Sequence, residues 1–526
     1  MVSQGWAQCV AVTGRMVHVT SRVGVAAPNA ASADAALTIA GLGGNAVDAA
    51  TAAMLTTMVN EPGLVSLTGG AFITIWPAGS DAAVTVDGCV AMPGRARPAD
   101  AEPPTVRDVN TGYGGGLAMT VGHGSVATPG ALAALHLAQQ RYGELPWQEV
   151  VAPALEIARS GFALGAAAGY YLPHTRESVF AWDPETSAAL RRDDGGWVEA
   201  GDTMVIDGLA GTLALIAKQG ARAMYDGELA DAIADDMRRR GGLLTRDDLS
   251  AYLPVVREAL ASRCGPWQLR TNPPPAFGGA VLTAMLSLLG NRPRGEWSID
   301  DVTRLIAVMR RILGYRRDRL DVAPDRERAA RALLDEVGVP RRGSASTAHI
   351  SVVDSAGGAS AITASSGYGS GATVPGTGLW LNNCLGEHEL NKGPPPAPGA
   401  RLASNMAPTV GRSNDGSILA IGSPGADRIT TALTQVLASF ANGRSDLQSA
   451  IDRPRLHVHY LDEAEQRVRI EAEEDMPLPD IDVPVRRHHP LSMYFGGVAA
   501  AHRDPSGGII AAADPRRDGA VAVSPG

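Results

Sequence analysis

Ser344-Ala345-Ser346-Thr347-Ala348-His349-Ile350-Ser351-Val352-Val353-Asp354 is the stretch at which the pattern of this sequence changes. The segment before Thr347 (341–346) is small, polar or basic, whereas apolar and polar residues alternate directly after it, as in a strand. A glycine-containing turn (355–358) and a second strand-like run (359–365) follow. The pattern predicts a loose connection that ends at a hydroxyl residue opening a hairpin. A nucleophile exposed by self-cleavage needs this arrangement, so we hypothesise a cut before Thr347.

The composition is that of a globular protein without a nucleic-acid or membrane partner. The chain has 526 residues, 45% of them hydrophobic, and a formal net charge of −9, which implies no broad basic surface. Its four cysteines are widely spaced, which predicts neither a disulfide scaffold nor a zinc module. Residues 1–18 lack the regions of a secretion signal, and no apolar run is long enough to cross a bilayer. We therefore expect a cytoplasmic protein.

Helical patterns dominate before Thr347. Two helices are expected within 30–58, the second capped by Asn45 with Asp48 in its first turn. Thr128 as a cap and Pro129 as a first residue predict another helix start. Further segments are predicted as strands at 71–76 and 83–87, a surface excursion at 100–124, helices in 145–160, 166–260 and 302–313, and an exposed helix followed by a loose tether at 316–346.

Strand patterns dominate after Thr347. They are expected at 348–354, 359–366, 378–382, 406–412, 417–422, 467–471, 494–500 and 509–513, with one helix at 426–441. The order of helices, then strands, then helices predicts two sheets between helical layers.

Thr347 needs a base before it can act as a nucleophile. A threonine hydroxyl is a poor nucleophile at neutral pH unless an adjacent group takes its proton. If the chain is cut before Thr347, the new α-amino group is such a base, because its unperturbed pKa is about 7.7–8.0. One cleavage would therefore produce the nucleophile and its base together.

A series of ordered motifs from about Ser21 to Arg517 carries a family resemblance. The motifs are Gly43-Gly44-Asn45-Ala46-Val47-Asp48-Ala49-Ala50, Val126-Ala127-Thr128-Pro129-Gly130, Tyr142-Gly143-Glu144-Leu145-Pro146-Trp147, Ala152-Pro153-Ala154, Thr347 to Asp354, Leu381-Asn382-Asn383, Gly422-Ser423-Pro424-Gly425 and Ala513-Asp514-Pro515-Arg516. With them, the chain resembles the γ-glutamyltranspeptidase family of N-terminal nucleophile hydrolases. The resemblance implies an α+β fold, a four-layer αββα sandwich, made as a precursor. Cleavage would give a large part (1–346) and a small part (347–526) within one αββα unit.

The resemblance also assigns catalytic roles. The precursor would be cut between Ser346 and Thr347, and Thr347 matches the catalytic threonine. Ser365 falls at the second hydroxyl, which activates the nucleophile. Gly425 and Ala426 match the Gly-Gly pair whose N–H groups form the oxyanion hole, and alanine keeps the N–H. Donors at the start of a helix suit a developing negative charge.

The substrate side departs from the family. Cys89 stands where the family has the arginine that clamps the γ-glutamyl carboxylate, and a thiol cannot replace a guanidinium there. Glu387 conservatively replaces the acid that holds the substrate ammonium group. The other implied substrate-binding positions are His349 and Ser404, which are retained, and Gly367, Cys384 and Asn405, which replace other residues. We therefore predict a substrate other than glutathione.

Two arginines near Cys89 offer a substitute clamp. Arg95 or Arg97 would have to swing toward the substrate, and the favoured interpretation is that both are solvated loop residues. We interpret Cys89 and Cys384 as small apolar residues of the pocket wall. The proline-rich connection between 387 and 404 is short, which favours an open site for a bulky substrate.

The sequence predicts no metal and no organic cofactor. His457 and His459, and likewise His488 and His489, have no third ligand at a recognisable spacing. The glycine-rich run 367–371 lacks the lysine and hydroxyl residue of a phosphate loop and is expected to form a tight turn.

The predicted function is that of a self-processed threonine hydrolase or acyltransferase that cleaves an amide of a small molecule. The expected partners are that substrate and the two subunits produced by cleavage. The sequence does not decide whether the protein forms a homo-oligomer. One alternative is a carbon–carbon bond hydrolase of antibiotic biosynthesis, as in lincomycin- or pyrrolobenzodiazepine-type alkylproline pathways. The other alternative is an unprocessed, non-catalytic family member that binds a ligand.

Overall fold

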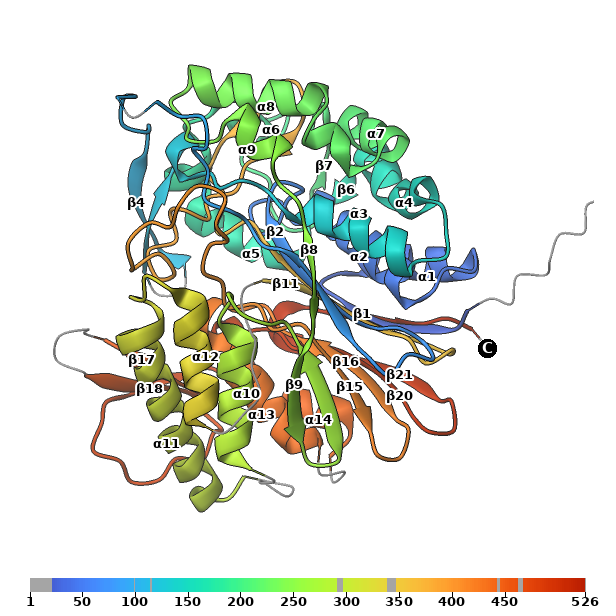
Figure 1. The fold of residues 1–526 in the computed structure, drawn as a ribbon, viewed down its shortest axis with the longest axis vertical. Coiled ribbons are helices and arrows are strands. Elements are labelled where there is room, and N and C mark those ends of the chain that lie inside the picture. The colour runs from blue at the N-terminus through green and yellow to red at the C-terminus, as the bar shows by residue number, and fades with distance from the viewer. Residues whose placement is uncertain are drawn as a thin grey trace, which may run out of the picture.

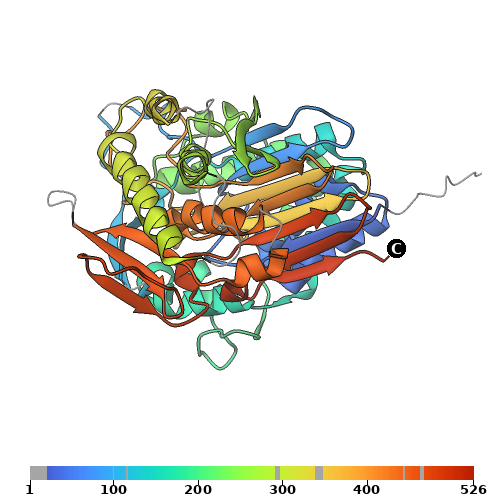
Figure 2. The same cartoon turned by 90° about the horizontal axis from the view of Figure 1, so that it is seen from below.

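Two antiparallel sheets are stacked between layers of helices in the computed structural model, which describes residues 21–98, 100–113, 116–290, 297–337, 347–441, 445–461 and 467–525 (Figures 1 and 2). The first sheet has the strand order β22 (Ala520–Val523), β1 (Val23–Ala27), β11 (Ala348–Asp354), β12 (Ala359–Ser365), β2 (Gly70–Trp76), β3 (Val84–Gly88) and β8 (Val255–Glu258). The second has the order β21 (Ile509–Ala513), β20 (Ala499–Arg503), β16 (Ile418–Gly422), β15 (Thr409–Ser413), β10 (Trp267–Thr271) and β9 (Leu260–Cys264).

Helices cover the outer faces of both sheets. Those on the first sheet include α1 (Ala30–Gly41), α2 (Ala46–Asn60) and α3 (Ala131–Tyr142), and α4 (Trp147–Ser160) packs on the outer side of α2. Those on the second include α10 (Gly278–Leu289), α13 (Ile429–Phe440) and α14 (Leu447–Asp452). The predicted α+β fold with αββα layers is therefore confirmed.

The remaining elements extend the sandwich at its two helical sides. Near the first sheet lie β4 (Arg107–Thr111), β5 (Leu117–Val121), β6 (Phe162–Ala163), α5 (Ala166–Thr175), α6 (Pro184–Ala189), β7 (Thr203–Met204), α7 (Leu209–Gln219), α8 (Glu228–Arg239), α9 (Arg246–Ser250), β13 (Thr373–Val374) and β14 (Leu379–Trp380). At the other side lie α11 (Ile299–Tyr315), α12 (Arg326–Glu336), β17 (Leu456–Tyr460), β18 (Val468–Glu473) and β19 (Val485–His488).

The core between the sheets is made of small and β-branched residues. Val353 and Ala361 of the first sheet pack in one cluster with Val410 and Ala420 of the second. Alternate residues of a strand point to opposite faces, so the other face of the first sheet is free to bury apolar side chains against the helices. Full burial of one such aliphatic side chain contributes about 1.5–3 kcal/mol.

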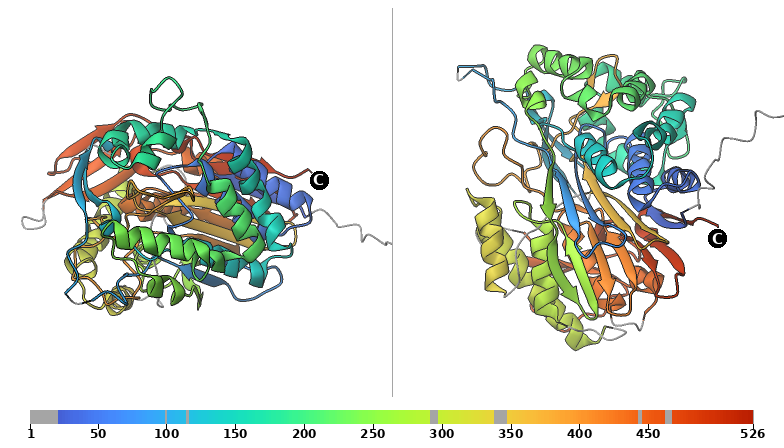
Figure 3. Two further views of the ribbon diagram at one scale, coloured as in Figure 1. Left: turned by 90° about the horizontal axis from the view of Figure 1, so that it is seen from above. Right: turned by 45° about the vertical axis from the view of Figure 1, so that its right-hand side comes forward.

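Segments that are far apart in the sequence meet in the first sheet. β11 and β12 lie between β1 and β2, so residues on both sides of the predicted cut share one sheet. The last strand, β22, pairs with the first, β1 (Figure 3). The two predicted parts therefore form one unit.

Local signals set several helix starts. Asn45 caps α2, and its side chain accepts from the N–H of Asp48 while the Asp48 carboxylate accepts from the N–H of Asn45, as the sequence predicted. The predicted start at Thr128 is wrong, because α3 begins at Ala131 with Gly130 as its cap. Thr128 instead exchanges both backbone hydrogen bonds with Ala91, at 2.9 and 3.0 Å, which leaves it in an extended bridge.

Three further boundaries differ from expectation. The segment 493–495 is a short 3-10 turn, and the strand starts only at Ala499. The helix expected at 426–441 begins as a 3-10 turn, η6 (Ala426–Arg428), before α13. The excursion at 100–124 contains the β4–β5 hairpin.

The charged segment after α11 is also more buried than the sequence suggested. Arg316 and Arg317 are buried, because Arg316 pairs with Asp321 at 3.0 Å inside the fold. The tether predicted within 338–346, including Ser346, lies outside the described residues. Within the described ranges, no helix combines the length and apolar character that a bilayer crossing requires.

Candidate active site

A cavity that is partly open to solvent lies where the start of β11 and the end of β12 meet the loop after β16. Seven of the sequence-predicted residues line it together, namely Thr347, His349, Ser365, Gly367, Glu387, Gly425 and Ala426. The catalytic positions implied by the sequence therefore converge on one cavity.

Thr347 is held at the mouth of the β11–β12 hairpin. Its N–H donates to the carbonyl of Ala364 at 2.9 Å, one residue before β11 begins. Its Oγ1 is buried and has no hydrogen-bond partner among the described residues. An unpartnered hydroxyl facing a cavity is available to react, because no internal bond has to be broken first.

Ser365 and Gly367 form a tight turn at the end of β12. The Gly367 N–H donates to Ser365 Oγ at 2.9 Å. Gly367 has a left-handed φ of 65°, and a Cβ there would lie 2.3 Å from the Asn383 side-chain oxygen and 3.2 Å from the Glu387 carboxyl. A larger residue at position 367 would therefore be strained and would clash with Asn383.

Gly425 and Ala426 form the opposite wall. Both have positive φ, 132° and 52° respectively, which turns the backbone between β16 and α13. Within the described part of the chain, neither N–H donates to a backbone acceptor. Free N–H groups at the beginning of a helix can stabilise negative charge on a substrate oxygen.

Glu387 lines the cavity in front of a buried polar layer. Burial raises the pKa of its carboxyl to about 8. Behind it, the Cys89 thiol donates to the Leu402 carbonyl at 3.7 Å. Burial also raises the pKa of the Cys89 thiol to about 12, so this thiol is neutral. Cys89, Cys384, Ser404 and Asn405 lie outside the residues that line the cavity.

His349 contributes its ring surface to the cavity. Ser351 Oγ donates to the Ala499 carbonyl at 3.0 Å, so it accepts from His349 Nε2–H at 2.7 Å. Nδ1 then accepts from the Thr363 hydroxyl at 2.9 Å. Both nitrogens are thus engaged within the protein, and burial lowers the pKa of His349 to about 3. The neutral ring packs against Gly422 and so ties β11 to the loop that carries Gly425.

Neither arginine proposed as a substitute clamp lines this cavity. The Arg95 backbone N–H bonds to Asp248 at 3.0 Å, and its side chain lines a different cavity together with Arg401. The Arg97 guanidinium bonds to the Glu102 carbonyl. The interpretation of both as loop residues matches their positions.

Sequence reasoning missed several residues that line the cavity, namely Glu61, Tyr113, Tyr368, Arg428 and Arg517. Glu61 is buried, and burial raises its pKa to about 7 although Asn29 donates to it at 2.8 Å. Its Oε2 and the Nε of Arg517 have no hydrogen-bond partner in the described ranges. Arg517 directly follows the motif that ends at Arg516, whereas no named motif adjoins Glu61.

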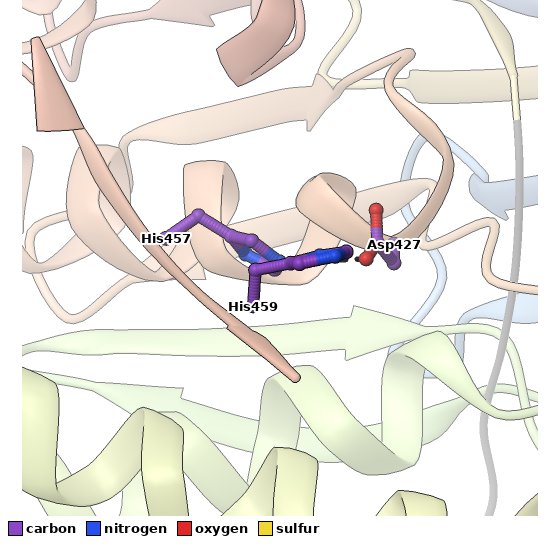
Figure 4. Close-up of side chains that lie close together, drawn as sticks. All are labelled: Asp427, His457 and His459. Atoms are coloured by element: carbon purple, nitrogen blue, oxygen red, sulfur yellow. Dashed lines mark ion pairs between the residues drawn. The ribbon is translucent and has the colours of Figure 1, made fainter. Parts of the chain in front are cut away.

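A second cluster lies directly behind the Gly425–Ala426 wall. Asp427, His457 and His459 each offer a ligand atom, and these atoms lie within 4.8 Å of one another (Figure 4). The spacing of the two histidines in the sequence could not indicate Asp427, because this residue comes from a different segment.

Comparisons with known proteins identify the family to which this chain belongs. The model of the family described as Gamma-glutamyltranspeptidase matches residues 32–524. The "Glutathione hydrolase proenzyme" of Escherichia coli (strain K12) is 27% identical, with 92% of this chain and 90% of that protein covered. The "Acylase ACY 1 proenzyme" of Pseudomonas sp. (strain V22) is 30% identical, with 95% and 93% covered.

Among solved structures, the cephalosporin acylase from Bacillus halodurans has a TM-score of 0.78 at 22% identity, and 98% of each chain is covered. LmbA2991HD has a TM-score of 0.75 at 23% identity, with 95% of this chain and 98% of that chain covered. At these identities, the two structures establish the likeness of the fold alone.

Proposed function

Because this chain belongs to the γ-glutamyltranspeptidase family and is an N-terminal nucleophile hydrolase, we propose that Thr347 is its nucleophile and that its substrate is an amide other than glutathione. The observation that carries this proposal is that Thr347, whose Oγ1 has no hydrogen-bond partner among the described residues, lines the same cavity as Gly425 and Ala426. A reactive hydroxyl and two free N–H groups are the parts that acyl transfer needs.

Maturation would use the same groups. Thr347 Oγ1 attacks the carbonyl carbon of Ser346, the peptide bond shifts from nitrogen to oxygen, and water hydrolyses the resulting ester. The large part then ends at Ser346, and Thr347 carries a free α-amino group. In the uncut chain, the Thr347 N–H donates to the Ala364 carbonyl. The new amine would therefore form beside that carbonyl.

The catalytic cycle would follow. The Thr347 amine takes the hydroxyl proton as Oγ1 attacks the substrate carbonyl, and the N–H groups of Gly425 and Ala426 bond to the oxyanion. The amine returns the proton to the leaving nitrogen, and an acyl-enzyme ester remains. Water, or an amine acceptor, releases the acyl group. Loss of one oxyanion donor typically lowers the rate about 10²- to 10³-fold.

Arg517 is our candidate for the substrate anchor. Its Nε has no acceptor among the described residues, whereas Arg428 is held by Asp427 and by the Tyr494 carbonyl at 3.1 Å. A guanidinium recognises a carboxylate by charge-assisted hydrogen bonds. Glu61, whose pKa is raised to about 7, adds a carboxyl that can donate or accept beside it. We therefore propose an acyl group or leaving group that carries an anionic end.

Two experiments test the function. Denaturing electrophoresis and intact mass analysis of the purified chain should give two fragments, the smaller beginning at Thr347, and an uncut chain would favour the non-catalytic alternative. γ-Glutamyl-p-nitroanilide should give little product, and efficient turnover of it would refute the specificity argument.

The anchor is tested with paired amides that carry a carboxylate or its neutral methyl ester. Arg517→Gln should lower kcat/KM for the carboxylate roughly 10- to 100-fold, the range of one charged hydrogen bond, and should leave the ester unchanged. Arg95→Gln is the matched control and should change neither. Identification of the released fragment by mass spectrometry separates amide hydrolysis from the carbon–carbon bond alternative.

A further inference from the structure

The side-chain cluster behind the Gly425–Ala426 turn carries an inference of its own. We propose that Asp427, His457 and His459 bind one divalent transition-metal ion, for which Zn²⁺ is the best fit. Their ligand atoms lie within 4.8 Å of one another, and Figure 4 shows the two imidazoles and the carboxylate converging on one point.

The backbone brings the three side chains to one place. His457 and His459 are separated by one residue on β17, so both point from the same face of the strand. Asp427 belongs to η6, the turn that follows Gly425. The site would therefore connect β17 with the wall of the candidate active site.

Hydrogen bonds fix which atoms of the cluster are free. Thr431 Oγ1 donates to the Arg428 carbonyl at 2.9 Å, so it must accept from His457 Nδ1–H, which lies 3.1 Å away. In the neutral imidazole, Nε2 therefore carries the lone pair, and it faces Asp427 Oδ2. Arg428 bonds to the other carboxylate oxygen, Oδ1. In metal sites of proteins, the ring nitrogen or carboxylate oxygen that does not bind the metal is typically held by a hydrogen bond to another group.

The separation of the facing atoms agrees with a bridging ion. His457 Nε2 and Asp427 Oδ2 are 3.4 Å apart. A direct bond between an imidazolium and a carboxylate is shorter, about 2.7–2.9 Å. Two ligands that each lie about 2.0–2.1 Å from a tetrahedral ion are about 3.3–3.4 Å apart. A lone pair that faces a carboxylate oxygen at this distance is repulsive unless a proton or a metal cation lies between them.

Neighbouring charges limit the set of ligands. Glu471 pairs with His457 across β17 and β18, but His488 bonds to it at 2.6 Å and Arg469 also holds it. It is therefore not available as a ligand. The Arg428 guanidinium opposes a cation, although it also orients the Asp427 carboxylate. Three protein ligands would leave a fourth position for water, and imidazole with carboxylate suits Zn²⁺.

Metal binding can be tested without any activity assay. The untagged chain is freed of metal with a chelator and titrated with Zn²⁺ against a chromophoric competitor. We expect one Zn²⁺ per chain, and replacement by Co²⁺ should give the visible absorption of a four-coordinate site. Thr431→Val, which removes the acceptor from His457, should lower the affinity about 10- to 100-fold.

His459→Gln should abolish the saturable binding. His489→Gln makes the same chemical change at an exposed histidine outside the cluster, so binding should be unchanged. If the wild-type chain binds no Zn²⁺ stoichiometrically, or if His459→Gln binds as tightly as wild type, the proposal is wrong and the cluster is an ion pair only. Should His459→Gln fail to fold, the Co²⁺ spectrum and Thr431→Val decide the question.

Discussion

Gly367→Ala tests the geometry of the candidate active site, because two separate penalties can be worked out for it. The left-handed φ of 65° is unfavourable for alanine by roughly 1–2 kcal/mol, of which the lower entropy of the unfolded chain offsets about 0.4–1 kcal/mol. In addition, the new Cβ would lie 2.3 Å from Asn383 Oδ1, which accepts from the Tyr368 N–H at 2.6 Å. Loss of that bond adds about 1–3 kcal/mol if the N–H stays buried.

Gly79→Ala is the matched control. Gly79 has a similar φ of 68°, but a Cβ there would meet nothing within 4 Å. Gly79→Ala should therefore show the backbone strain alone, roughly 1 kcal/mol, whereas Gly367→Ala should show about 3 kcal/mol.

The thermal unfolding of both variants and of the wild type is measured by calorimetry. For a chain of this size, 1 kcal/mol corresponds to roughly 2 °C or less in Tm, so Gly367→Ala should melt several degrees below Gly79→Ala. Activity should fall only in Gly367→Ala, because the turn also holds Ser365 Oγ at 2.9 Å. Equal melting temperatures for the two variants would refute the close contact with Asn383.

Three further predictions concern the same cavity. Thr347→Ala should leave the chain uncut and inactive, whereas Thr347→Ser should still be cut, but more slowly than wild type. Intact mass analysis over time distinguishes the two variants. A cleaved Thr347→Ala chain would exclude self-processing by this residue. Ala426→Gly should raise Tm slightly, because a φ of 52° strains alanine by about 1 kcal/mol but not glycine. The N–H at this position is kept. A lower Tm by calorimetry would contradict this prediction. Glu387 keeps its proton up to a raised pKa of about 8 in the folded state but loses it near pH 4.5 in the unfolded state, so its contribution to stability falls as the pH rises between these values. Glu387→Gln should therefore flatten the dependence of Tm on pH over that range. An unchanged slope would contradict the burial of the carboxyl.

Local patterns were enough to predict the elements that build the site. The alternation after Thr347 predicted the β11–β12 hairpin, and Asn45 with Asp48 predicted the start of α2. These signals work because a strand or a capped helix is specified by residues that are neighbours in the sequence. The Thr128 prediction failed because hydrogen bonds to Ala91, from another segment, outweighed a good capping residue.

The pocket chemistry could not be predicted in this way. Glu61 and Arg517 come from opposite ends of the chain, yet both line the cavity with Thr347. Arg95, close in sequence to the missing clamp, lines another cavity. Which charges face a substrate depends on how the β1–β11 and β11–β12 pairings and the packing of the two sheets bring distant segments together.

The sequence by itself therefore determined the sandwich, the family and the position of the candidate nucleophile, since periodicity and ordered motifs are written in short stretches. Only the tertiary structure decided that His349 is engaged on both nitrogens, that Arg517 lines the cavity, and that a carboxylate lies close to His457 and His459. The physical reason is that hydrogen bonds and charges act over a few ångströms in space. Their partners are therefore chosen by the fold and not by spacing along the chain.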